Sequence, residues 1–362
     1  MTPIKPLPFG TLASGEPVSL WRLANAHGAT ADITNLGGCL VSLRVPDAHG
    51  TFTDVVLGYD GAAAYAVNVP NFGAPVGRHA NRIGGAAFTI DGVRYQLEDN
   101  EKGNNLHSGS NPWHRRLWQV EEAEQGEDGA RITLSLVSPD GDQGFPGEVR
   151  MRVSYELTAS DALAITYEGT PSAPTVINLT NHSYFNLNGH ASGTALHHTL
   201  QVHAAAYTEV CEDLVPTGTI LPVEGTPLDL REPRELAPGV QSDFAPIVGA
   251  HGYDHNYVLE TPEPTEADAG FVGALREVAT LTGDASGISL TVSCDTPGMQ
   301  VYTGNFVGGE QGKGGAHYHD HDAVCLETQF FPDAPNHPEF AQPVFGPEHP
   351  YKSRTVFAFS HA

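Results

Sequence analysis

The sequence predicts an all-β protein built as one large antiparallel β-sandwich, with a single domain over residues 1–362. Gly 40 and Pro 27 among 362 residues indicate many short strands joined by turns. Strand-type alternation recurs from end to end, whereas helical periodicity is weak throughout. The one linker-like stretch, Thr261–Ala269, is interpreted as an exposed loop between strands. We therefore expect no domain boundary.

The strand elements follow one another along the whole chain. Within Glu148–Leu157 the alternation is clean, which predicts one face on a core and the other in water. Ala87–Leu97 carries Asp91-Gly92 between two alternating arms, a strong hairpin signal. Glu339–Val344 is expected to form one or two helical turns. The other predicted strands are Val18–Leu23, Ala29–Leu43, Arg131–Ser138, Ala162–Gly169, Leu196–Ala204, Ala279–Leu281, Ile288–Cys294, Met299–Phe306, Ala323–Phe330 and Thr355–Phe359.

The charge balance excludes several classes of partner. Asp+Glu 43 against Lys+Arg 18 gives a formal net charge of -25. Such a surface repels nucleic-acid phosphates and anionic lipid, so we expect neither nucleic-acid nor membrane binding. It also disfavours a phosphorylated substrate, although a local pair of arginines could override the overall field.

Cysteine usage and the N-terminus both favour a cytoplasmic protein. Cys39, Cys211, Cys294 and Cys325 are far apart and beside apolar runs, which predicts buried free thiols. The first residues lack an apolar core of signal-peptide length, and no apolar run is long enough to span a bilayer.

The stretch Thr175–Leu187 begins as a buried strand and then becomes unusually polar. Its sequence is T-V-I-N-L-T-N-H-S-Y-F-N-L, with Asn178, Asn181 and His182 among apolar residues. Each buried amide needs hydrogen-bond partners or costs about 1–3 kcal/mol. Either these groups converge on a ligand rich in hydroxyls, such as a sugar, or they satisfy the backbone of a turn. The stretch alone does not decide between the two.

Four further residues stand out as candidates for a site. Arg78, in G-R-H-A-N-R-I-G-G, could bind hydroxyls or a carboxylate through a forked pair of hydrogen bonds, with an ordinary salt bridge as the alternative. His107 and Asp254 lie in turn-like segments and could serve a pocket or only a turn. Glu327, within an apolar strand, favours function because a carboxylate there is expensive unless paired or employed.

The tract His317–Asp322 has histidines at strand spacing, as some metal sites do. A Gly-rich lead-in and the lack of a second ligand cluster indicate a surface loop instead, so we expect no metal. The sequence also lacks a nucleophile elbow, a P-loop and a dinucleotide-binding glycine motif.

Taken together, these segments resemble the aldose 1-epimerases, also called galactose mutarotases. The resemblance implies a galactose mutarotase-like supersandwich with the sugar in an open cleft on one sheet. The matching pieces begin at Asn35 (N-L-G-G-C-L-V-S-L-R-V-P-D), Asp54 (D-V-V-L-G-Y-D), Asn81 (N-R-I-G-G-A-A-F-T-I-D-G-V-R-Y-Q-L), Asn178 (N-L-T-N-H-S-Y-F-N-L), His251 (H-G-Y-D-H-N-Y-V-L), Pro297 (P-G-M-Q-V-Y-T-G-N) and Cys325 (C-L-E-T-Q).

The resemblance also implies roles for individual residues. Glu327 corresponds to a general base acting ionised, and His182 to a general acid acting protonated. The substrate would be a free aldohexose such as galactose or glucose, with no cofactor and no metal, in a monomer or homodimer. The residues similar to those that hydrogen-bond the sugar are Arg78, His107 and Asp254, with Asn81 and Asn305 as further candidates.

Two alternatives and one departure from the family pattern accompany this prediction. A hexose-6-phosphate 1-epimerase would need a cationic patch, for which Arg78 and Arg82 are the clearest candidates. A non-catalytic carbohydrate-binding module would not need both His182 and Glu327. Where the family usually has L-H-G-G, this chain has L-H-S-G, so Ser108 is expected to alter the loop that carries His107. Trp113, shortly after it, is a candidate platform for a sugar face.

Overall fold

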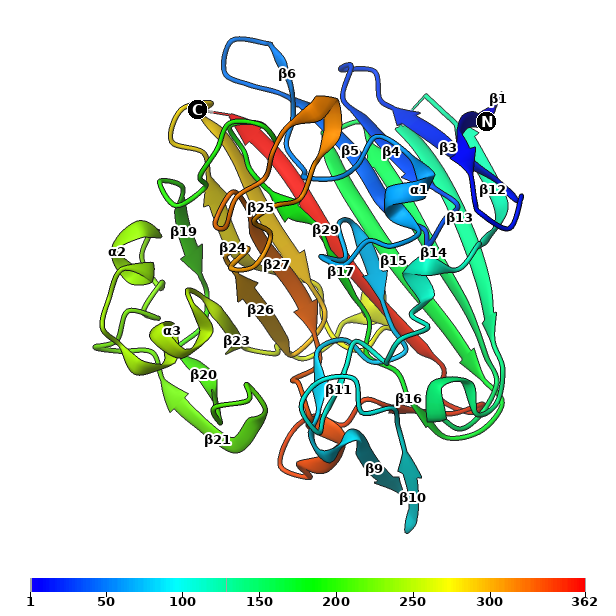
Figure 1. Ribbon diagram of the computed structural model, residues 1–362, viewed down its shortest axis with the longest axis vertical. Coiled ribbons are helices and arrows are strands. Elements are labelled where there is room, and N and C mark those ends of the chain that lie inside the picture. Colours follow the sequence, from blue (N-terminus) through cyan, green and yellow to red (C-terminus); the bar gives the residue numbers. More distant parts are fainter. Residues whose placement is uncertain (1, 128, 362) are drawn as a thin grey trace.

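The computed structural model describes residues 2–127 and 129–361, and its named elements are mainly strands (Figure 1). The predicted all-β fold is confirmed. The large sheets pair antiparallel throughout. Within the described residues, no helix is long and apolar enough to cross a membrane. The α-helices have four to six residues each and are α1 (Ala62–Tyr65), α2 (Ala237–Val240) and α3 (Ala245–Ala250).

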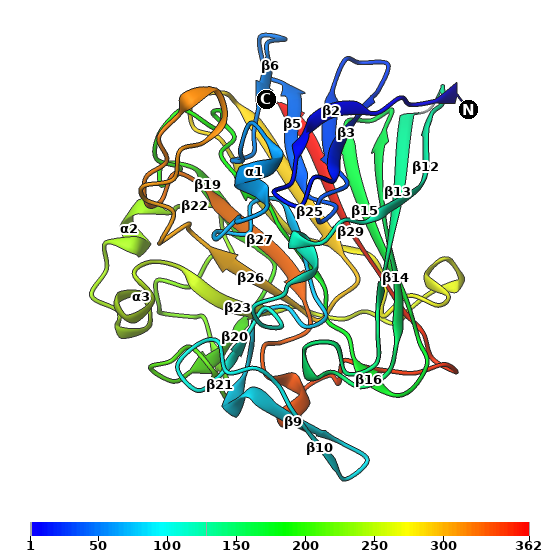
Figure 2. The same cartoon turned by 45° about the vertical axis from the view of Figure 1, so that its right-hand side comes forward.

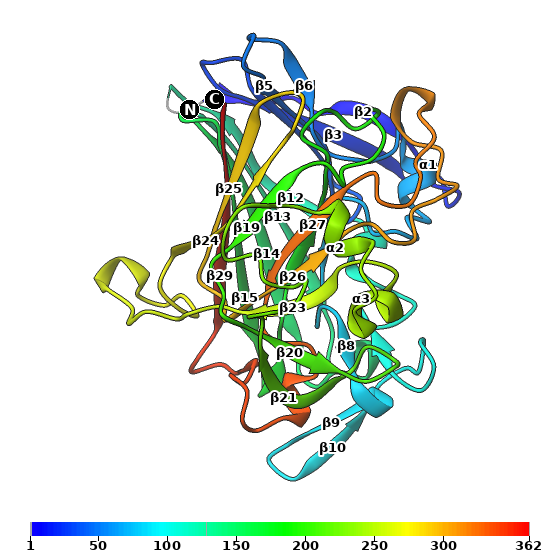
Figure 3. The same ribbon diagram turned by 90° about the vertical axis from the view of Figure 1, so that its left-hand side faces the viewer.

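A ten-stranded sheet forms one layer of the molecule and is seen close to edge-on in Figure 3. Its strands, in spatial order, are β1 (Thr2–Pro3), β12 (Gln119–Gln125), β13 (Gly129–Ser138), β14 (Val149–Thr158), β15 (Ala162–Pro171), β29 (Tyr351–His361), β25 (Ile288–Cys294), β24 (Arg276–Thr282), β19 (Thr199–Val202) and β22 (Arg234–Glu235).

Two smaller sheets pack on the ten-stranded sheet. The six-stranded sheet consists, in spatial order, of β18 (Tyr184–Phe185), β27 (Val324–Gln329), β26 (Gly298–Tyr302), β23 (Asp254–Val258), β20 (Ala206–Val210) and β21 (Pro216–Pro222). The five-stranded sheet consists of β2 (Leu7–Thr11), β3 (Pro17–Ala24), β4 (Thr30–Thr34), β5 (Leu40–Pro46) and β6 (Phe52–Asp54). The two-stranded pairs are β7 (Ala74–Val76) with β17 (Thr180–His182), β8 (Arg82–Ile83) with β11 (Asn105–Leu106), β9 (Ala87–Ile90) with β10 (Val93–Gln96), and β16 (Thr175–Val176) with β28 (Val344–Phe345).

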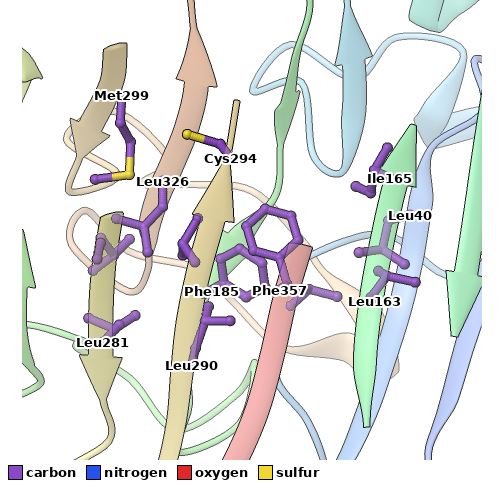
Figure 4. Close-up of a cluster of buried hydrophobic side chains, with 14 of the residues drawn as sticks. Leu40, Leu163, Ile165, Phe185, Leu281, Leu290, Cys294, Met299, Leu326 and Phe357 are labelled. Carbon is purple, nitrogen blue, oxygen red and sulfur yellow. The ribbon is translucent and has the colours of Figure 1, made fainter. Parts of the chain in front are cut away.

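The main hydrophobic core lies between these layers. Leu163 of β15, Phe357 of β29 and Val292 of β25 are directly paired neighbours, so their side chains share one face of the ten-stranded sheet. That face packs against residues of both smaller sheets within one continuous cluster. The rings of Phe185 and Phe357 lie 5.0 Å apart within this core (Figure 4). Buried and less buried residues alternate along β14 and β25, as the sequence pattern predicted.

Several local predictions are confirmed and one is wrong. Ile90 pairs with Val93 across the Asp91-Gly92 turn, and both turn residues have positive φ (50° and 79°), as a two-residue hairpin requires. The hairpin projects at the bottom of Figure 1. Residues 339–344 form no helix, since Pro343 prevents a helix from continuing there.

The polar stretch Thr175–Leu187 is not one strand but three short ones. β16, β17 and β18 pair with β28, β7 and β27 respectively, so each segment joins a different neighbour. The amides mostly hold backbone. Asn178 bonds both backbone groups of Phe330, and the Asn186 amide donates to carbonyls of Gly193 and Asp322. Hydrogen bonds to the backbone therefore explain most of the buried amide side chains in this stretch.

A buried ion pair ties the segment between β26 and β27 to the five-stranded sheet. The Lys313 ammonium donates to Asp54 Oδ2 at 2.7 Å and to the carbonyl of Val41 at 2.9 Å. The side chains of Lys313 and Asp54 are only 9% and 14% exposed. This contact matters for the site because Phe306 and Glu310 of the same segment line the cleft described below.

Replacing Lys313 by Met leaves Asp54 buried without its cation. We expect the free energy of unfolding to fall by about 3 kcal/mol, the usual cost of breaking a buried pair on one side. Denaturant titration measures this change. The double variant Lys313→Met/Asp54→Asn should recover part of the loss. A loss well under 1 kcal/mol would mean that the pair contributes no more than an exposed one.

Candidate active site

Side-chain alternation along β27 separates core residues from cleft residues. Val324 and Leu326 belong to the main hydrophobic core, whereas Cys325 and Glu327 point to the opposite face, where Cys325 joins a second hydrophobic cluster and Glu327 lines the cleft. The next strand, β26, repeats this pattern with Met299 in the core. Because one set of alternate side chains packs into the core, the other set must lie on the opposite face of the six-stranded sheet, where the polar residues are.

The register of the sheet places the polar residues in rows. Cys325 pairs with Tyr302, and Tyr302 pairs with Asp254 on β23. In the adjacent row, Glu327 pairs with Gln300. Directly opposed residues point to the same face, so these side chains form one polar surface. A cleft of about 300 Å³ lies over it, at the small end of the range for ligand pockets.

His182 enters the cleft from a neighbouring strand, β17. Its ring stacks on Tyr184, with centroids 5.0 Å apart, and meets His107 edge to face at 5.6 Å. His182 Nε2 lies 3.7 Å from Glu327 Oε1, and His182 Nδ1 lies 3.6 Å from Cys325 Sγ. The predicted acid and the predicted base thus lie side by side in one cleft.

Burial disfavours the charged forms of both Glu327 and His182. Burial, and then the nearby Asp254, hold the pKa of Glu327 well above its usual range, with Arg82 opposing the shift. Burial lowers the pKa of His182 to about 4. The ionised glutamate and protonated histidine that we expected are therefore not the favoured resting forms. Burial therefore favours the neutral forms of both groups, with the exchangeable proton of the pair on Glu327 rather than on His182.

A backbone hydrogen bond determines which ring nitrogen of His107 carries the proton. The backbone N–H of Asn81 donates to His107 Nδ1 at 3.1 Å. Because that nitrogen accepts, the neutral ring carries its proton on Nε2 and can donate from there. Asn81 and His107 both have left-handed backbones, with φ of 60° and 51°. Ser108 fixes the loop further, since its hydroxyl bonds both the N–H and the carbonyl of His79.

Asp254 and Arg82 are held in place by other polar groups of the cleft. Asp254 Oδ1 accepts from the Gln300 amide at 2.6 Å. Burial raises the pKa of Asp254, while Arg82 opposes that shift. Arg82 is bound by Glu101 through two hydrogen bonds of 2.7 and 2.8 Å. These contacts make the polar lining rigid before any ligand arrives.

The structure brings five of the seven predicted residues into the cleft: Asn81, His107, His182, Asp254 and Glu327. Arg78 is not among them. Its guanidinium is fully buried and donates to the carbonyls of Pro146 and Gly147 and to the side chains of Thr175 and Ser138. Burial lowers the pKa of Arg78 to about 10. The expectation that Arg78 binds sugar is corrected, because Arg78 fastens loops together.

Asn305 and Trp113 also lie outside the cleft lining. The Asn305 amide donates to the carbonyls of Ala250 and Tyr253, which fixes the turn that leads into β23. Asn305 therefore supports Asp254 from behind rather than lining the cleft. The Trp113 side chain is completely buried and packs edge to face with Trp118, so it offers no platform to a sugar.

Sequence reasoning named Arg82 only for the phosphate-binding alternative and missed it as a residue of the sugar cleft. The available signal was alternation in N-R-I-G-G: Ile83 belongs to a hydrophobic cluster, so its neighbour Arg82 must point the other way. The remaining members carried no such signal, because they come from loops and strand ends far apart in the sequence. They include Asn71, Tyr302, Phe306 and Glu310.

The chain matches the sequence model of the family described as aldose 1-epimerase over residues 19–358. It belongs to the aldose 1-epimerase family. Galactose mutarotase of Rattus norvegicus is 39% identical over 355 residues, 98% of each chain. Aldose 1-epimerase of Escherichia coli K12 is 33% identical over 347 residues, 95% of this chain and 96% of the relative. The resemblance read from the sequence motifs is thereby confirmed.

Solved structures agree with this family assignment. An aldose epimerase homologue from C. elegans superposes with a TM-score of 0.85 at 28% identity, covering 95% of this chain and 99% of the other. Galactose 1-epimerase from Lactobacillus acidophilus shares the fold, with a TM-score of 0.84 at 22% identity and full coverage of both chains. The mutarotase-like sandwich is thus the fold of this aldose 1-epimerase family member.

The buried carboxyl of Glu327 should destabilise the folded protein increasingly as pH rises. The raised pKa means that the folded state keeps a proton that the unfolded chain releases above its ordinary value of about 4.3. Stability therefore falls as pH rises from that value through the raised one. Glu327→Gln removes this penalty, so we expect its melting temperature to exceed that of wild type by a few degrees at pH 8.

The control for this measurement is the same comparison of wild type and Glu327→Gln at low pH. Below pH 4 the carboxyl is protonated in both states, so the two proteins should melt together. A Glu327→Gln variant that melts below wild type at pH 8 would contradict the inferred cost of burying this group.

Proposed function

We propose that the protein is an aldose 1-epimerase that interconverts the α- and β-anomers of free aldohexoses such as galactose and glucose. The observation that carries this proposal is the 3.7 Å approach of His182 to Glu327 on the floor of a monosaccharide-sized cleft. The full-length similarity to galactose mutarotases supports it.

The reaction requires one proton to leave and another to arrive. Glu327 takes the proton of the C1 hydroxyl while His182 gives a proton to the ring oxygen. The ring opens, the C1–C2 bond rotates, and the aldehyde is attacked on its other face with the two roles reversed. Each group typically contributes about 10²–10⁴-fold to the rate. The C1 hydroxyl oxygen and the ring oxygen are bonded to the same carbon, so Glu327 and His182, lying side by side, can each reach one of them.

The shared proton explains how two buried, nearly neutral groups could do this work. Moving the proton from Glu327 to His182 creates the carboxylate and imidazolium that the reaction needs without changing the net charge. A buried pair of opposite charges costs less than either charge alone. The sugar hydroxyls would further stabilise this form by hydrogen bonding to both groups.

The remaining cleft residues would orient the sugar. His107 offers its Nε2–H as a donor, and Asn81 keeps its amide N–H groups available because its oxygen accepts from the Arg82 backbone. Asp254 keeps Oδ2 as an acceptor, since Gln300 binds Oδ1. A pyranose, whose hydroxyls both donate and accept, matches this mixture of groups.

The electrostatics of the cleft favour a free sugar over a sugar phosphate. Among the described residues that line it, Arg82 is the only lysine or arginine, and Glu101 already binds it. Asp254 and Glu310 line the same space. A phosphate dianion placed among these carboxylates would be repelled. A purely sugar-binding module is disfavoured because it would not need an acid and a base at contact distance.

Other features of the protein remain proposals. We expect the whole chain to act as one domain, which the core cluster shared by all three large sheets supports. We also expect a cytoplasmic protein that works as a monomer or homodimer without a cofactor.

Removing either catalytic group should abolish most of the activity. Polarimetry of freshly dissolved α-galactose or α-glucose should show a loss of several orders of magnitude in Glu327→Gln and in His182→Asn. Asp295→Asn is the matched control. Asp295 is also a buried carboxyl, with a pKa raised to about 7 by burial, but it lies outside the cleft lining.

The same assay with glucose 6-phosphate separates the two epimerase alternatives, and we expect turnover at least tenfold lower than with glucose. Near wild-type turnover in Glu327→Gln would refute the assignment of the base. A wild-type protein that binds galactose without accelerating mutarotation would establish the binding-module alternative.

The pH dependence should reflect the shared proton. We expect kcat/KM to follow a bell whose acid limb lies near pH 4, where His182 takes a second proton, since burial lowers its pKa to about 4. The alkaline limb follows the raised pKa of Glu327 and therefore lies well above the ordinary carboxyl value of about 4.3. A narrow bell between about 4.3 and 6.5, the ordinary carboxyl and imidazole values, would contradict this.

A further inference from the structure

The proposed reaction does not use Cys325, although its thiol lies against the imidazole of His182, behind the cleft lining. Cys325 is fully buried, as a free thiol, two residues before Glu327 on the same face of β27. Its Sγ lies 3.6 Å from His182 Nδ1. An acid, a base and a thiol are thus held together by two neighbouring strands, β17 and β27.

The donor atoms of these three side chains converge. One donor atom from each of His182, Cys325 and Glu327 lies within 4.8 Å of the other two. Ligand atoms around a tetrahedral zinc ion are about 3.5 Å apart, so small side-chain rotations would complete the geometry. Among the described residues, Glu327 Oε2 is buried without a hydrogen-bond partner, and Glu327 is only 3% exposed. The carboxyl group that approaches His182 through Oε1 therefore also holds a buried oxygen without a partner, which is available for coordination.

We propose that His182, Cys325 and Glu327 bind a thiophilic divalent cation, Zn²⁺ or Cd²⁺, and that the bound ion inhibits the mutarotase reaction. The inference rests on the proposed function for its inhibitory consequence, but the binding site itself does not depend on that function.

The chemistry of the donor set selects the ion. Thiolate, imidazole and carboxylate are the usual ligands of zinc, whereas Mg²⁺ and Ca²⁺ prefer sites made of oxygen atoms. On binding, the Cys325 thiol and the Glu327 carboxyl each release a proton to solvent, and His182 coordinates as the neutral ring. The two negative charges so formed balance the two positive charges of the ion. A buried site with no net charge avoids the large cost of isolated buried ions.

The ion would inhibit by occupying the lone pairs that move protons. Coordinated Glu327 cannot accept the C1 proton, and coordinated His182 cannot carry the second one. His182 and Glu327 both line the cleft, so an ion held by them would also obstruct the position of the sugar. Carboxylates at the cleft, such as Asp254 and Glu310, would raise the local concentration of cations.

The histidine tract His317–Asp322 does not provide a competing site of this kind. Among the described residues, the one group of three converging donors is His182, Cys325 and Glu327. The tract contributes no residue to it. His319 is paired with Asp322, and His321 Nδ1 lies 3.1 Å from the carbonyl of Thr303.

Polarimetry with and without ZnCl₂ tests the inhibition. Micromolar zinc should slow wild-type mutarotation at least tenfold, EDTA should restore the rate, and MgCl₂ should have no effect. Cys325→Ser, compared with its own metal-free rate, should lose at least nine-tenths of the inhibition. The matched control is Cys211→Ser, because Cys211 is the exposed thiol of the chain and would account for non-specific thiol binding. Its inhibition should equal that of wild type.

Titration with CdCl₂ tests the binding without relying on activity. Coordination of the Cys325 thiolate should produce the ultraviolet charge-transfer absorption of a cadmium–thiolate bond, with one ion bound per chain. The band should be absent in Cys325→Ser and present in Cys211→Ser. Saturating galactose should suppress it in wild type, which provides a second measurement should Cys325→Ser fold poorly.

The outcomes separate this inference from the proposed function. A wild-type protein that gives the cadmium band but has no mutarotase activity would refute the function and leave the site intact. Absence of the band in wild type, its persistence in Cys325→Ser, or zinc inhibition that is equal in Cys325→Ser and wild type would each overturn the inference.

Discussion

The alternation of side chains along β27 is the constraint on which the cleft depends. Val324 and Leu326 face the core, and each such buried side chain contributes about 1.5–3 kcal/mol. A shift of one residue in register would move them to the polar face and carry Glu327 into the core. The hydrophobic effect that holds the two layers together therefore also fixes the position of the carboxylate. Precision at the site comes from the packing behind it.

That same packing sets the electrostatic character of the site. Groups placed against a hydrophobic sandwich lose water, so the pKa of Glu327 rises and the pKa of His182 falls. Neither group then carries charge readily alone, yet a proton transferred between them changes no net charge. The supporting polar contacts, such as Gln300 to Asp254 and Glu101 to Arg82, orient dipoles toward the sugar position without adding a free cation. The cleft suits a neutral substrate for this reason.

The sequence allowed prediction where local pattern decides structure, and failed where tertiary placement decides it. Ile288–Cys294 was predicted at its observed bounds because alternation and flanking turns are local signals. Thr175–Leu187 was predicted only to begin as a buried strand, since nothing local shows that its pieces join three partners. Arg78 and Arg82 are four residues apart in one Gly-rich segment, and only the folded chain shows that the first binds loop carbonyls while the second lines the cleft. The prediction that Asn305 lines the cleft was wrong for a similar reason, because its hydrogen-bond partners lie about fifty residues away in the sequence.

The place of β29 in the ten-stranded sheet has a consequence for how the protein forms in a cell. β29 is the last strand in chain order, yet it lies between β15 and β25 near the middle of the sheet (Figure 2). Until a ribosome has released residues 351–361, both of these neighbours present an unpaired edge, and such edges invite association with other chains. Between the synthesis of β25 and that of β29, the nascent protein therefore has its largest layer divided in two. Completion of this sheet is deferred until residues 351–361 have emerged, and shielding by chaperones matters most before that point.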